Sequence, residues 1–327
     1  MNRRESFAAF AVLGGASSSA ALAQPAARIA RIGFLSLYQG GDSRSRAGFI
    51  QGLHELGYQE GRNVVIESRD AEGHLERLPG LAAELVARKV DVIVAPSTPA
   101  AQAARQATTT IPIVFAGAAD PVADGFVASL ARPGGNLTGL SNVAAELVGK
   151  RLELLKQAVP TLTRVALLWG PAPEGTPKDM LKMAEIAAPA LGVQLQLVEV
   201  RGAGDIDRAF ADMARARADA LTILPIAIFF SERKRIIAMA AKNRLPAIYT
   251  SRTFVDDGGM MAYGANLTAM VRRAASYVDR ILKGARPSDL PVEQATKFEL
   301  VINRGTAKAL GLTIPQSVLL SADEVVG

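Results

Sequence analysis

Residues 111–116 read IPIVFA, and residues 245–250 read LPAIYT. Both hexapeptides have the same order: an aliphatic residue, a proline, two apolar residues, an aromatic residue and a small residue. A proline followed by an apolar run is typical of the start of a buried strand. Because the pattern occurs in two distant parts of the chain, we expect two similar units, each with this strand at the same place in its sheet.

Candidate strands and helices alternate on both sides of each hexapeptide. In the first predicted helix, Phe49, Leu53 and Leu56 recur at i, i+4 and i+7, as a core-facing helix requires. In the first unit the predicted strands are 31–36, 63–67, 90–95 and 112–116, and further helices are predicted at 78–86 and 100–107. In the second unit the predicted helices are 144–159, 178–191, 206–217 and 231–243, and the strands are 164–169, 193–200, 220–224 and 247–250.

This alternation predicts the α/β class, with two doubly wound, Rossmann-like lobes whose sheets are covered on both faces. Ligands of open α/β sheets bind beyond the carboxyl ends of the strands. The loops there are rich in hydroxyl groups, glycine and proline, at 36–42, 96–99, 117–121, 170–173, 225–227 and 250–252. Such loops suit a carboxylate or another small polar ligand, because they present backbone N–H groups at helix N-termini. The alternative is that their hydroxyls only cap helices and turns.

The first 23 residues have the order of an export signal. Arg3 and Arg4 are basic, residues 7–13 are apolar, and residues 21–23 read Ala-Leu-Ala, a small-x-small cleavage site. We therefore expect cleavage near Ala23 and a mature protein in the periplasm. The paired arginines leave both Sec and twin-arginine export open.

The composition excludes several classes of chemistry. The chain has 327 residues, no cysteine and two histidines, His54 and His74. Without cysteine there is no disulfide scaffold, thiolate nucleophile or cysteine-ligated metal. The histidines are not in an H-E-x-x-H pattern, and His54 is expected to be an exposed helix residue. We expect no catalytic residue, no metal site and no cofactor.

Sequence motifs of the common nucleotide-binding and hydrolase sites are also missing. No Gly-x-Gly-x-x-Gly follows the first predicted strand, and no Gly-x-Ser-x-Gly or Walker motif occurs. Lys plus Arg exceed Asp plus Glu by 37 to 31, a net charge of +6. The densest basic run, 233–235, lies on a predicted helix without interleaved aromatics, which favours a solvated helix face over a nucleic-acid site.

Several longer motifs resemble one family from end to end of the mature chain. They read RIGFLS (31–36), GLHELGYQEG (52–61), VDVIV (90–94), IPIVF (111–115), ADPV (119–122), RPGGNLTG (132–139), LPAIY (245–249) and KFELVIN (297–303). Together they resemble the ABC-transporter substrate-binding family that includes the tryptophan/tyrosine-type binding proteins. The resemblance implies a type I periplasmic binding fold, in which two lobes joined by three crossover segments close on a small molecule like a hinge.

The resemblance also implies the division of the chain. We expect crossovers near 138–143, 263–266 and 290–294. The first lobe would comprise 24–140 and 265–290, and the second 141–264 and 291–327.

By the same resemblance, the ligand is expected to contact the loops named above. The predicted ligand residues of the first lobe are Ser36, Tyr38, Ser97, Thr98, Ala118 and Asp120. Those of the second lobe are Trp169, Pro171, Ile226, Ser251, Arg252 and Asp256, and those of the hinge are Ser141 and Asn142.

Three of these residues have a more specific expected role. Arg252 is the candidate carboxylate clamp, because its planar fork matches that group. Asp120 binds an amine or, alternatively, caps a helix that begins at Pro121. Trp169 stacks on a planar ligand or, alternatively, packs in the core.

The sequence departs from the family pattern at two loops. Residues 169–173 read WGPAP, where relatives often have Asn-Pro-x-Asn-Pro, and Pro225-Ile226 stands where relatives often have an Asp. The second departure removes one carboxylate that would bind the amine of an amino acid.

The sequence therefore predicts a monomeric, non-catalytic solute-binding component of an ABC importer, without nucleic-acid partners. It would capture a small polar or aromatic solute, an amino acid or carboxylate, and deliver it to a membrane permease and its ATPase. The alternative is a periplasmic sensor that presents its closed form to a receptor or kinase. The effector domain of a LacI-like repressor shares the architecture, but it would need a helix-turn-helix N-terminus where this chain has an export signal.

Overall fold

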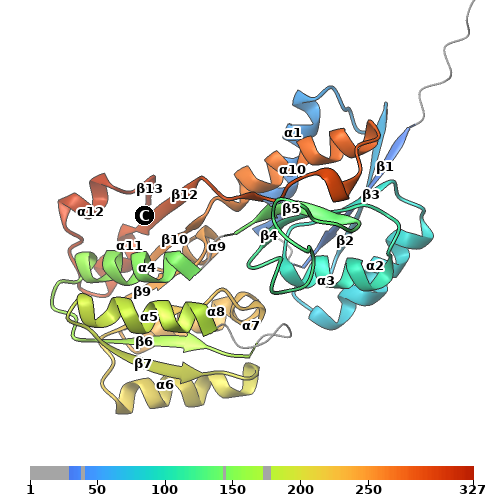
Figure 1. The fold of residues 1–327 in the computed structure, drawn as a ribbon. Helices are drawn as coiled ribbons and strands as arrows, with labels where there is room; N and C mark the ends of the chain where they lie inside the picture. Colours follow the sequence, from blue (N-terminus) through green and yellow to red (C-terminus); the bar gives the residue numbers. More distant parts are fainter. Residues whose placement is uncertain (1–28, 38–40, 143–144, 172–177) are drawn as a thin grey trace, which may run out of the picture.

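The computed structural model describes residues 29–37, 41–142, 145–171 and 178–327, which form two α/β lobes (Figure 1). The export signal predicted for residues 1–23 and the predicted ligand residue Tyr38 lie outside these ranges. No helix of the described residues is both long and apolar enough to cross a bilayer.

The first lobe is built on a six-stranded parallel sheet with the order β11-β5-β4-β3-β1-β2. One face packs against α1 and α10 through Phe34, Phe49 and Val271, and the other packs against α2 and α3 through Leu35 and Leu85. The strands are β1 (Ala30–Ser36), β2 (Val64–Asp70), β3 (Val92–Ala95), β4 (Ile113–Ala118), β5 (Leu137–Ser141) and β11 (Glu293–Gln294). The helices are α1 (Gly41–Glu55), α2 (Leu78–Ala87), α3 (Thr98–Ala107) and α10 (Leu267–Leu282).

The second lobe is built on a seven-stranded sheet with the order β13-β12-β10-β9-β8-β6-β7, in which only the β10–β12 pair is antiparallel. The strands are β6 (Arg164–Trp169), β7 (Gln194–Glu199), β8 (Ala220–Ile223), β9 (Ala247–Tyr249), β10 (Met261–Ala265), β12 (Phe298–Asn303) and β13 (Glu324–Val326). The helices are α4 (Ala145–Ala158), α5 (Lys178–Ala190), α6 (Ile206–Arg215), α7 (Ala227–Ser231), α8 (Arg233–Lys242), α9 (Arg252–Asp256), α11 (Arg304–Ala309) and α12 (Gln316–Leu320).

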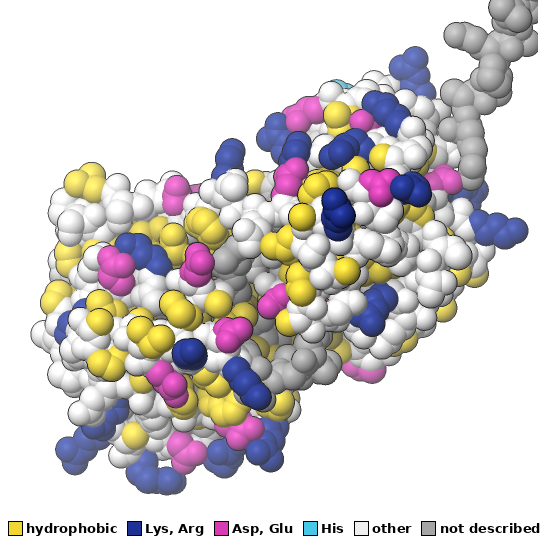
Figure 2. Space-filling model, in the orientation of Figure 1, with side chains coloured by type: hydrophobic (Ala, Val, Ile, Leu, Met, Phe, Trp, Pro, Cys, Tyr) yellow, Lys and Arg dark blue, Asp and Glu magenta, His cyan; other side chains and the backbone are white. Residues whose placement is uncertain are grey.

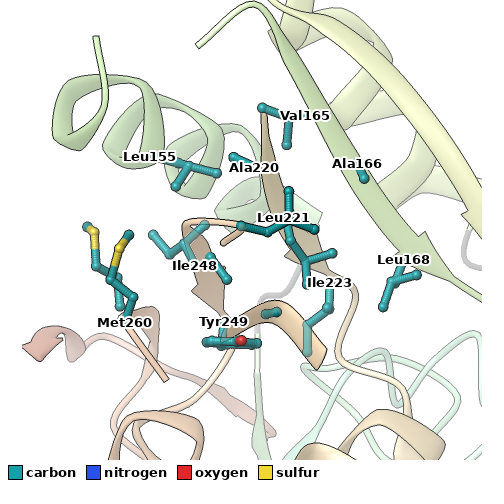
Figure 3. Close-up of a cluster of buried hydrophobic side chains, with 14 of the residues drawn as sticks. Leu155, Val165, Ala166, Leu168, Ala220, Leu221, Ile223, Ile248, Tyr249 and Met260 are labelled. Carbon is teal, nitrogen blue, oxygen red and sulfur yellow. The ribbon is translucent and has the colours of Figure 1, made fainter. Parts of the chain in front are cut away.

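The core of the second lobe lies between this sheet and its helices. Figure 3 shows Leu155 of α4 over Ala220 and Leu221 of β8 and Ile248 of β9, all of which are buried. Every residue of β3 and of β8 is buried, because a parallel sheet with helices on both faces exposes neither side of its central strands.

The two hexapeptides occupy equivalent places, as the sequence predicts. Residues 113–118 form β4 between β3 and β5, and residues 247–249 form β9 between β8 and β10. In each case the proline lies directly before the strand. The strand order from β2 to β5 in the first sheet matches the order from β7 to β10 in the second, so the expected similarity of the two units is confirmed.

The chain passes between the lobes three times: after Ser141, at Asn266, and at residues 295–297. The third passage comes later than the predicted range 290–294. Glu293 and Gln294 pair with β5, and the Tyr277 hydroxyl donates to the Pro291 carbonyl at 2.7 Å. Residues 291–294 therefore belong to the first lobe, not to the second as predicted. A two-residue strand leaves no periodic pattern from which to predict it.

The other two boundaries shift by one residue. Ser141 pairs within the first sheet, and Ala265 pairs with Phe298 within the second.

Candidate ligand-binding cleft

A cavity of about 670 Å³ lies between the lobes, at the carboxyl ends of the strands of both sheets. This is the size and the place expected for a small-molecule site in an α/β protein. Its walls come from the loops after β1, β3 and β4 on one side and after β8 and β9 on the other. Residues at the passages between the lobes form its base.

Loops held by local hydrogen bonds form the first-lobe wall. The Ser97 hydroxyl accepts a hydrogen bond from the Ala100 N–H and caps α3, and the Thr98 hydroxyl accepts one from the Ala119 N–H at 3.3 Å. The first bond caps the helix after β3, and the second joins the β3–α3 loop to the loop after β4.

The Asp120 side chain is exposed on the same wall. Its Oδ1 accepts hydrogen bonds from the N–H groups of Val122 and Ala123, at 3.2 and 3.0 Å. Asp120 therefore caps a turn at 121–125, where the sequence alternative expected a helix.

The second-lobe wall includes an aromatic residue that was not predicted from the sequence. Phe230 lines the cavity together with Pro225 and Ile226. Its ring meets the Phe254 ring edge-on, with 5.2 Å between the ring centroids. The Phe254 ring stacks on that of the buried Tyr249, with 4.7 Å between the centroids. The run Ile228-Phe229-Phe230, directly after the loop that follows β8, was the available signal.

Arg252 enters the same wall at the start of α9, after the N-cap Ser251. Its two Nη groups donate to the two carboxylate oxygens of Glu324 on β13, and its Nε lies 3.4 Å from an Asp256 oxygen. The bond to Glu324 raises the pKa of Arg252 above its ordinary value. A ligand carboxylate would therefore share this guanidinium with Glu324 or displace it.

Contacts between described residues join the lobes across the cleft. Arg44 of α1 forms an ion pair with Asp256 of α9 at 2.8 Å, and the Ser231 hydroxyl donates to the Gly73 carbonyl at 3.3 Å. The structure therefore has the lobes in a closed arrangement.

The base of the cavity contains two further oxygen acceptors. Asn142 lines it, and the Asn142 Oδ1 is buried without a hydrogen-bond donor in the described part of the chain. Glu299 of β12 also lines it, and its Oε2 accepts a hydrogen bond from the Asn266 Nδ2 at 3.1 Å. Burial raises the pKa of the Glu299 carboxyl above its usual range. Glu299 was not predicted, since within the strand FELVIN it reads as an outward-facing residue.

Most predicted ligand residues come together at this cavity. The ones that line it are Ser97, Thr98, Asp120, Ser141, Asn142, Ile226, Ser251, Arg252 and Asp256.

Four described residues that were predicted to contact the ligand do not line it. Ser36 and Ala118 are buried at the ends of β1 and β4, and their neighbours Leu37, Gly117 and Ala119 line the cavity instead. Successive side chains of a strand point to opposite sides, so a shift of one residue separates wall from core. Trp169 packs against the second-lobe core, and Pro171 lies outside the cavity.

The profile of the family described as ABC transporter substrate binding protein matches residues 37–326. The chain belongs to this family. Its members are solute-binding proteins rather than enzymes, and they act outside the cytoplasm as components of ABC transporters. The match supports the transporter interpretation and gives no support to the sensor alternative.

Named relatives and solved structures agree with this membership. The chain is 28% identical to a tyrosine-binding protein of Clostridioides difficile. The alignment spans 282 residues, which are 86% of this chain and 79% of the relative. It is 26% identical, with a TM-score of 0.81, to a Streptococcus pneumonia ABC domain in complex with L-Trp, covering 91% of this chain and 99% of that one. A ligand-free, open substrate-binding protein with adhesive properties from Clostridium difficile has the same identity and coverages, with a TM-score of 0.68.

The difference between these two TM-scores agrees with the contacts across the cleft. At equal identity and coverage, the described arrangement is more similar to the L-Trp complex than to the open, ligand-free protein. Two periplasmic binding proteins at 14% and 15% identity share the fold, with TM-scores of 0.56 and 0.55. The fold is therefore the type I periplasmic binding fold, as predicted.

Figure 2 shows that Lys and Arg side chains on this face are scattered among acidic ones over both lobes. His54 is exposed at the end of α1, as predicted, and His74 pairs with Glu76.

Proposed function

We propose that this protein is the periplasmic solute-binding component of an ABC importer and that it captures an aromatic amino acid between its two lobes. The observation that carries the proposal is the aromatic wall at Phe230, which faces a cavity large enough for such a ligand. The printed ligands of the relatives, tyrosine and L-Trp, support the same class.

An aromatic ring fits the second-lobe wall by its chemistry. Edge-to-face contacts with a ring such as Phe230 contribute about 0.5–1.5 kcal/mol beyond the burial of apolar area. Phe254 and Tyr249 hold Phe230 in place from behind, so little side-chain freedom is lost when a ligand binds.

The polar residues around the cavity would bind the backbone groups of the amino acid. Arg252 remains the candidate clamp for the α-carboxylate, helped by the hydroxyl of Ser251. In this interpretation the carboxylate competes with Glu324 for the guanidinium, which limits the affinity and favours release to the transporter.

The export signal predicted at residues 1–23 supports a mature protein in the periplasm, where it would act as a monomer. From there it would deliver its ligand to a permease and its ATPase in the inner membrane. Ligand capture would involve no turnover.

A thermal-shift screen of the mature protein tests the function. Amino acids, aromatic acids and dicarboxylates are added one at a time, and tyrosine and tryptophan are expected to raise Tm. A ligand at 100 times its Kd stabilises a protein by about 2.7 kcal/mol. If neither aromatic amino acid raises Tm, or if a bound compound is converted to a product, the proposal is wrong.

Arg252→Ala then tests the clamp with the ligand that the screen identifies. Loss of a charge-assisted, bidentate contact is expected to weaken binding by about tenfold or more. Arg215→Ala, which removes an exposed arginine of α6, is the matched control. Unchanged affinity in Arg252→Ala would remove the clamp from the account and leave the rest in place.

A further inference from the structure

Among the charged side chains that interact with Glu299, carboxylates outnumber guanidinium groups. Glu299 interacts electrostatically with Asp256, Asp323, Glu324 and Arg252. Arg252 is bound to Glu324, and Arg44 pairs with Asp256. Two guanidinium groups therefore face four carboxylates, and the two that remain are Glu299 and Asp323.

These two remaining carboxylates differ in their surroundings. Asp323 is exposed to solvent and accepts a hydrogen bond from the Leu300 N–H at 2.7 Å. Glu299 lines the cavity, is half-buried, and has no cation within ion-pair distance in the described part of the chain. Its one described hydrogen bond, from Asn266, engages only Oε2.

A half-buried carboxylate in such a place is stabilised by a proton or by a cation. Burial withdraws water from the charged form, and this is why the pKa of Glu299 is raised. The Asn142 Oδ1, buried and without a donor among the described residues, lines the same cavity. A carboxylate without a described ion pair and a buried amide oxygen without a described donor fit a group that carries several N–H bonds and a positive charge.

We propose that Glu299 is a specificity-determining residue that binds the ammonium group of the ligand, with the Asn142 Oδ1 as a second acceptor. This inference rests on the proposed function and narrows it, because the site then selects amino acids over the corresponding carboxylic acids. Arg252 and Glu299 interact electrostatically across the base of the cleft. Their opposite charges match the α-carboxylate and α-ammonium groups, which a single carbon joins.

The consequence for specificity follows from the cost of leaving polar groups unpaired. A site built to bind an N–H group rejects an analogue that lacks it, because the Asn142 Oδ1 would then have no donor and the Glu299 carboxylate would have only the Asn266 amide. The amino acid and its deaminated analogue present the same ring and the same carboxylate, so the comparison isolates the ammonium.

The test measures two ligand pairs by calorimetry on the mature protein. The pairs are L-tyrosine with 3-(4-hydroxyphenyl)propionate, and L-tryptophan with indole-3-propionate. The wild type is expected to bind each amino acid at least about tenfold more tightly than its analogue. In Glu299→Gln this preference is expected to fall to about threefold or less, while the affinity for the analogues changes little.

Two further variants keep the test decisive. Glu185→Gln removes a carboxylate from the exposed surface of α5 and should retain the full preference. Asn142→Leu removes the second acceptor and should weaken binding of the amino acids alone. Glu299→Gln is expected to unfold, without ligand, at the same temperature as the wild type or higher, because Gln keeps an acceptor for Asn266 and removes a charge that faces three other carboxylates.

The outcomes separate this inference from the proposed function. A preference that persists in Glu299→Gln overturns the role of Glu299 and leaves the function intact. Equal binding of amino acid and analogue by the wild type also overturns it and points to a carboxylic acid as ligand. No binding of any of the four compounds contradicts the function itself.

Discussion

The two walls of the cleft hold their polar side chains in different ways. In the first lobe, the oxygens of Ser97, Thr98 and Asp120 accept hydrogen bonds from nearby backbone N–H groups. In the second lobe, Arg252 binds Glu324, which lies 72 residues away, and Phe230 rests on the buried pair Phe254 and Tyr249. The first wall is thus a frame of capped loops, whereas tertiary contacts position the charged and aromatic groups of the second.

This difference suggests that the two lobes have different roles in ligand binding. The frame of the first lobe gives the cavity its shape, and the second lobe and the hinge provide the groups that distinguish one ligand from another. In both lobes, however, a glycine on the strand before a passage between the lobes packs directly against a neighbouring backbone carbonyl.

The largest expected effect concerns these two glycines, one in each lobe. A Cβ at Gly139 of β5 would overlap the carbonyl oxygen of Phe115, and a Cβ at Gly264 of β10 would overlap that of Thr250. Gly139 also has φ of +148°, which favours glycine. We expect Gly139→Ala and Gly264→Ala to destabilise the fold by about 3 kcal/mol or more, with the larger loss for Gly139.

Chemical denaturation of the ligand-free protein measures both variants. Gly202→Ala is the control, since a Cβ there meets no atom within 4 Å. If Gly139→Ala and Gly264→Ala both unfold at nearly the wild-type denaturant concentration, the two glycines are not in close contact with the neighbouring carbonyls.

A smaller effect on stability is expected when one buried charged residue in each lobe is replaced, and the two replacements should have opposite effects. Asp279 of the first lobe accepts a hydrogen bond from the Tyr58 hydroxyl at 3.0 Å and pairs with Lys283. Arg151 of the second lobe donates only to the Tyr263 carbonyl, at 3.3 Å, and its Nε and Nη2 are buried without a partner among the described residues. Burial lowers the pKa of Arg151 to about 10, so the side chain keeps its charge at neutral pH and this buried charge costs the fold stability.

Substitution of the two residues should therefore change stability in opposite directions. Asp279→Asn is expected to cost about 2 kcal/mol, because it weakens a charge-assisted pair. Arg151→Met is expected to be neutral or stabilising, because an apolar side chain of similar volume replaces an uncompensated charge. Both are measured by thermal unfolding at neutral pH, and a strong loss of stability in Arg151→Met would show that its charge has a partner.

The smallest expected effect tests directly whether the two lobes have different roles in ligand binding. Phe230→Ala removes the aromatic face of the second-lobe wall and should weaken tyrosine or tryptophan binding by about tenfold. Val122→Ala, on the first-lobe wall, removes apolar area without a ring and should change the affinity by about threefold or less. Equal losses in the two variants would contradict the idea that the second lobe carries the selectivity.

The sequence was sufficient to predict the elements whose structure depends on neighbouring residues in the chain. Buried parallel strands such as β3 and β8 are continuous apolar runs, and the caps at Ser97 and Ser251 follow strands in the sequence. Nine predicted residues reach the cavity because the carboxyl ends of the strands in both sheets face it.

The sequence was not sufficient to predict the cavity lining where a shift of one residue along a strand, or a partner far away in the chain, determines which side chain lies in the site. Ser36 and Ala118 each lie one position from a residue that lines the cavity, and no pattern distinguishes the two. Glu299 lies within a strand motif, and the engagement of Arg252 by Glu324 depends on where the last strand joins the sheet.

The central claim is that an aromatic amino acid binds in the cleft, and calorimetric titration of the mature protein with L-tyrosine and L-tryptophan tests it most directly. The account predicts one ligand per protein and a negative heat-capacity change, because the ring leaves water for the wall at Phe230. It also predicts weaker binding in Phe230→Ala than in the wild type. Saturable binding of neither amino acid, or binding of equal strength in Phe230→Ala, would contradict it.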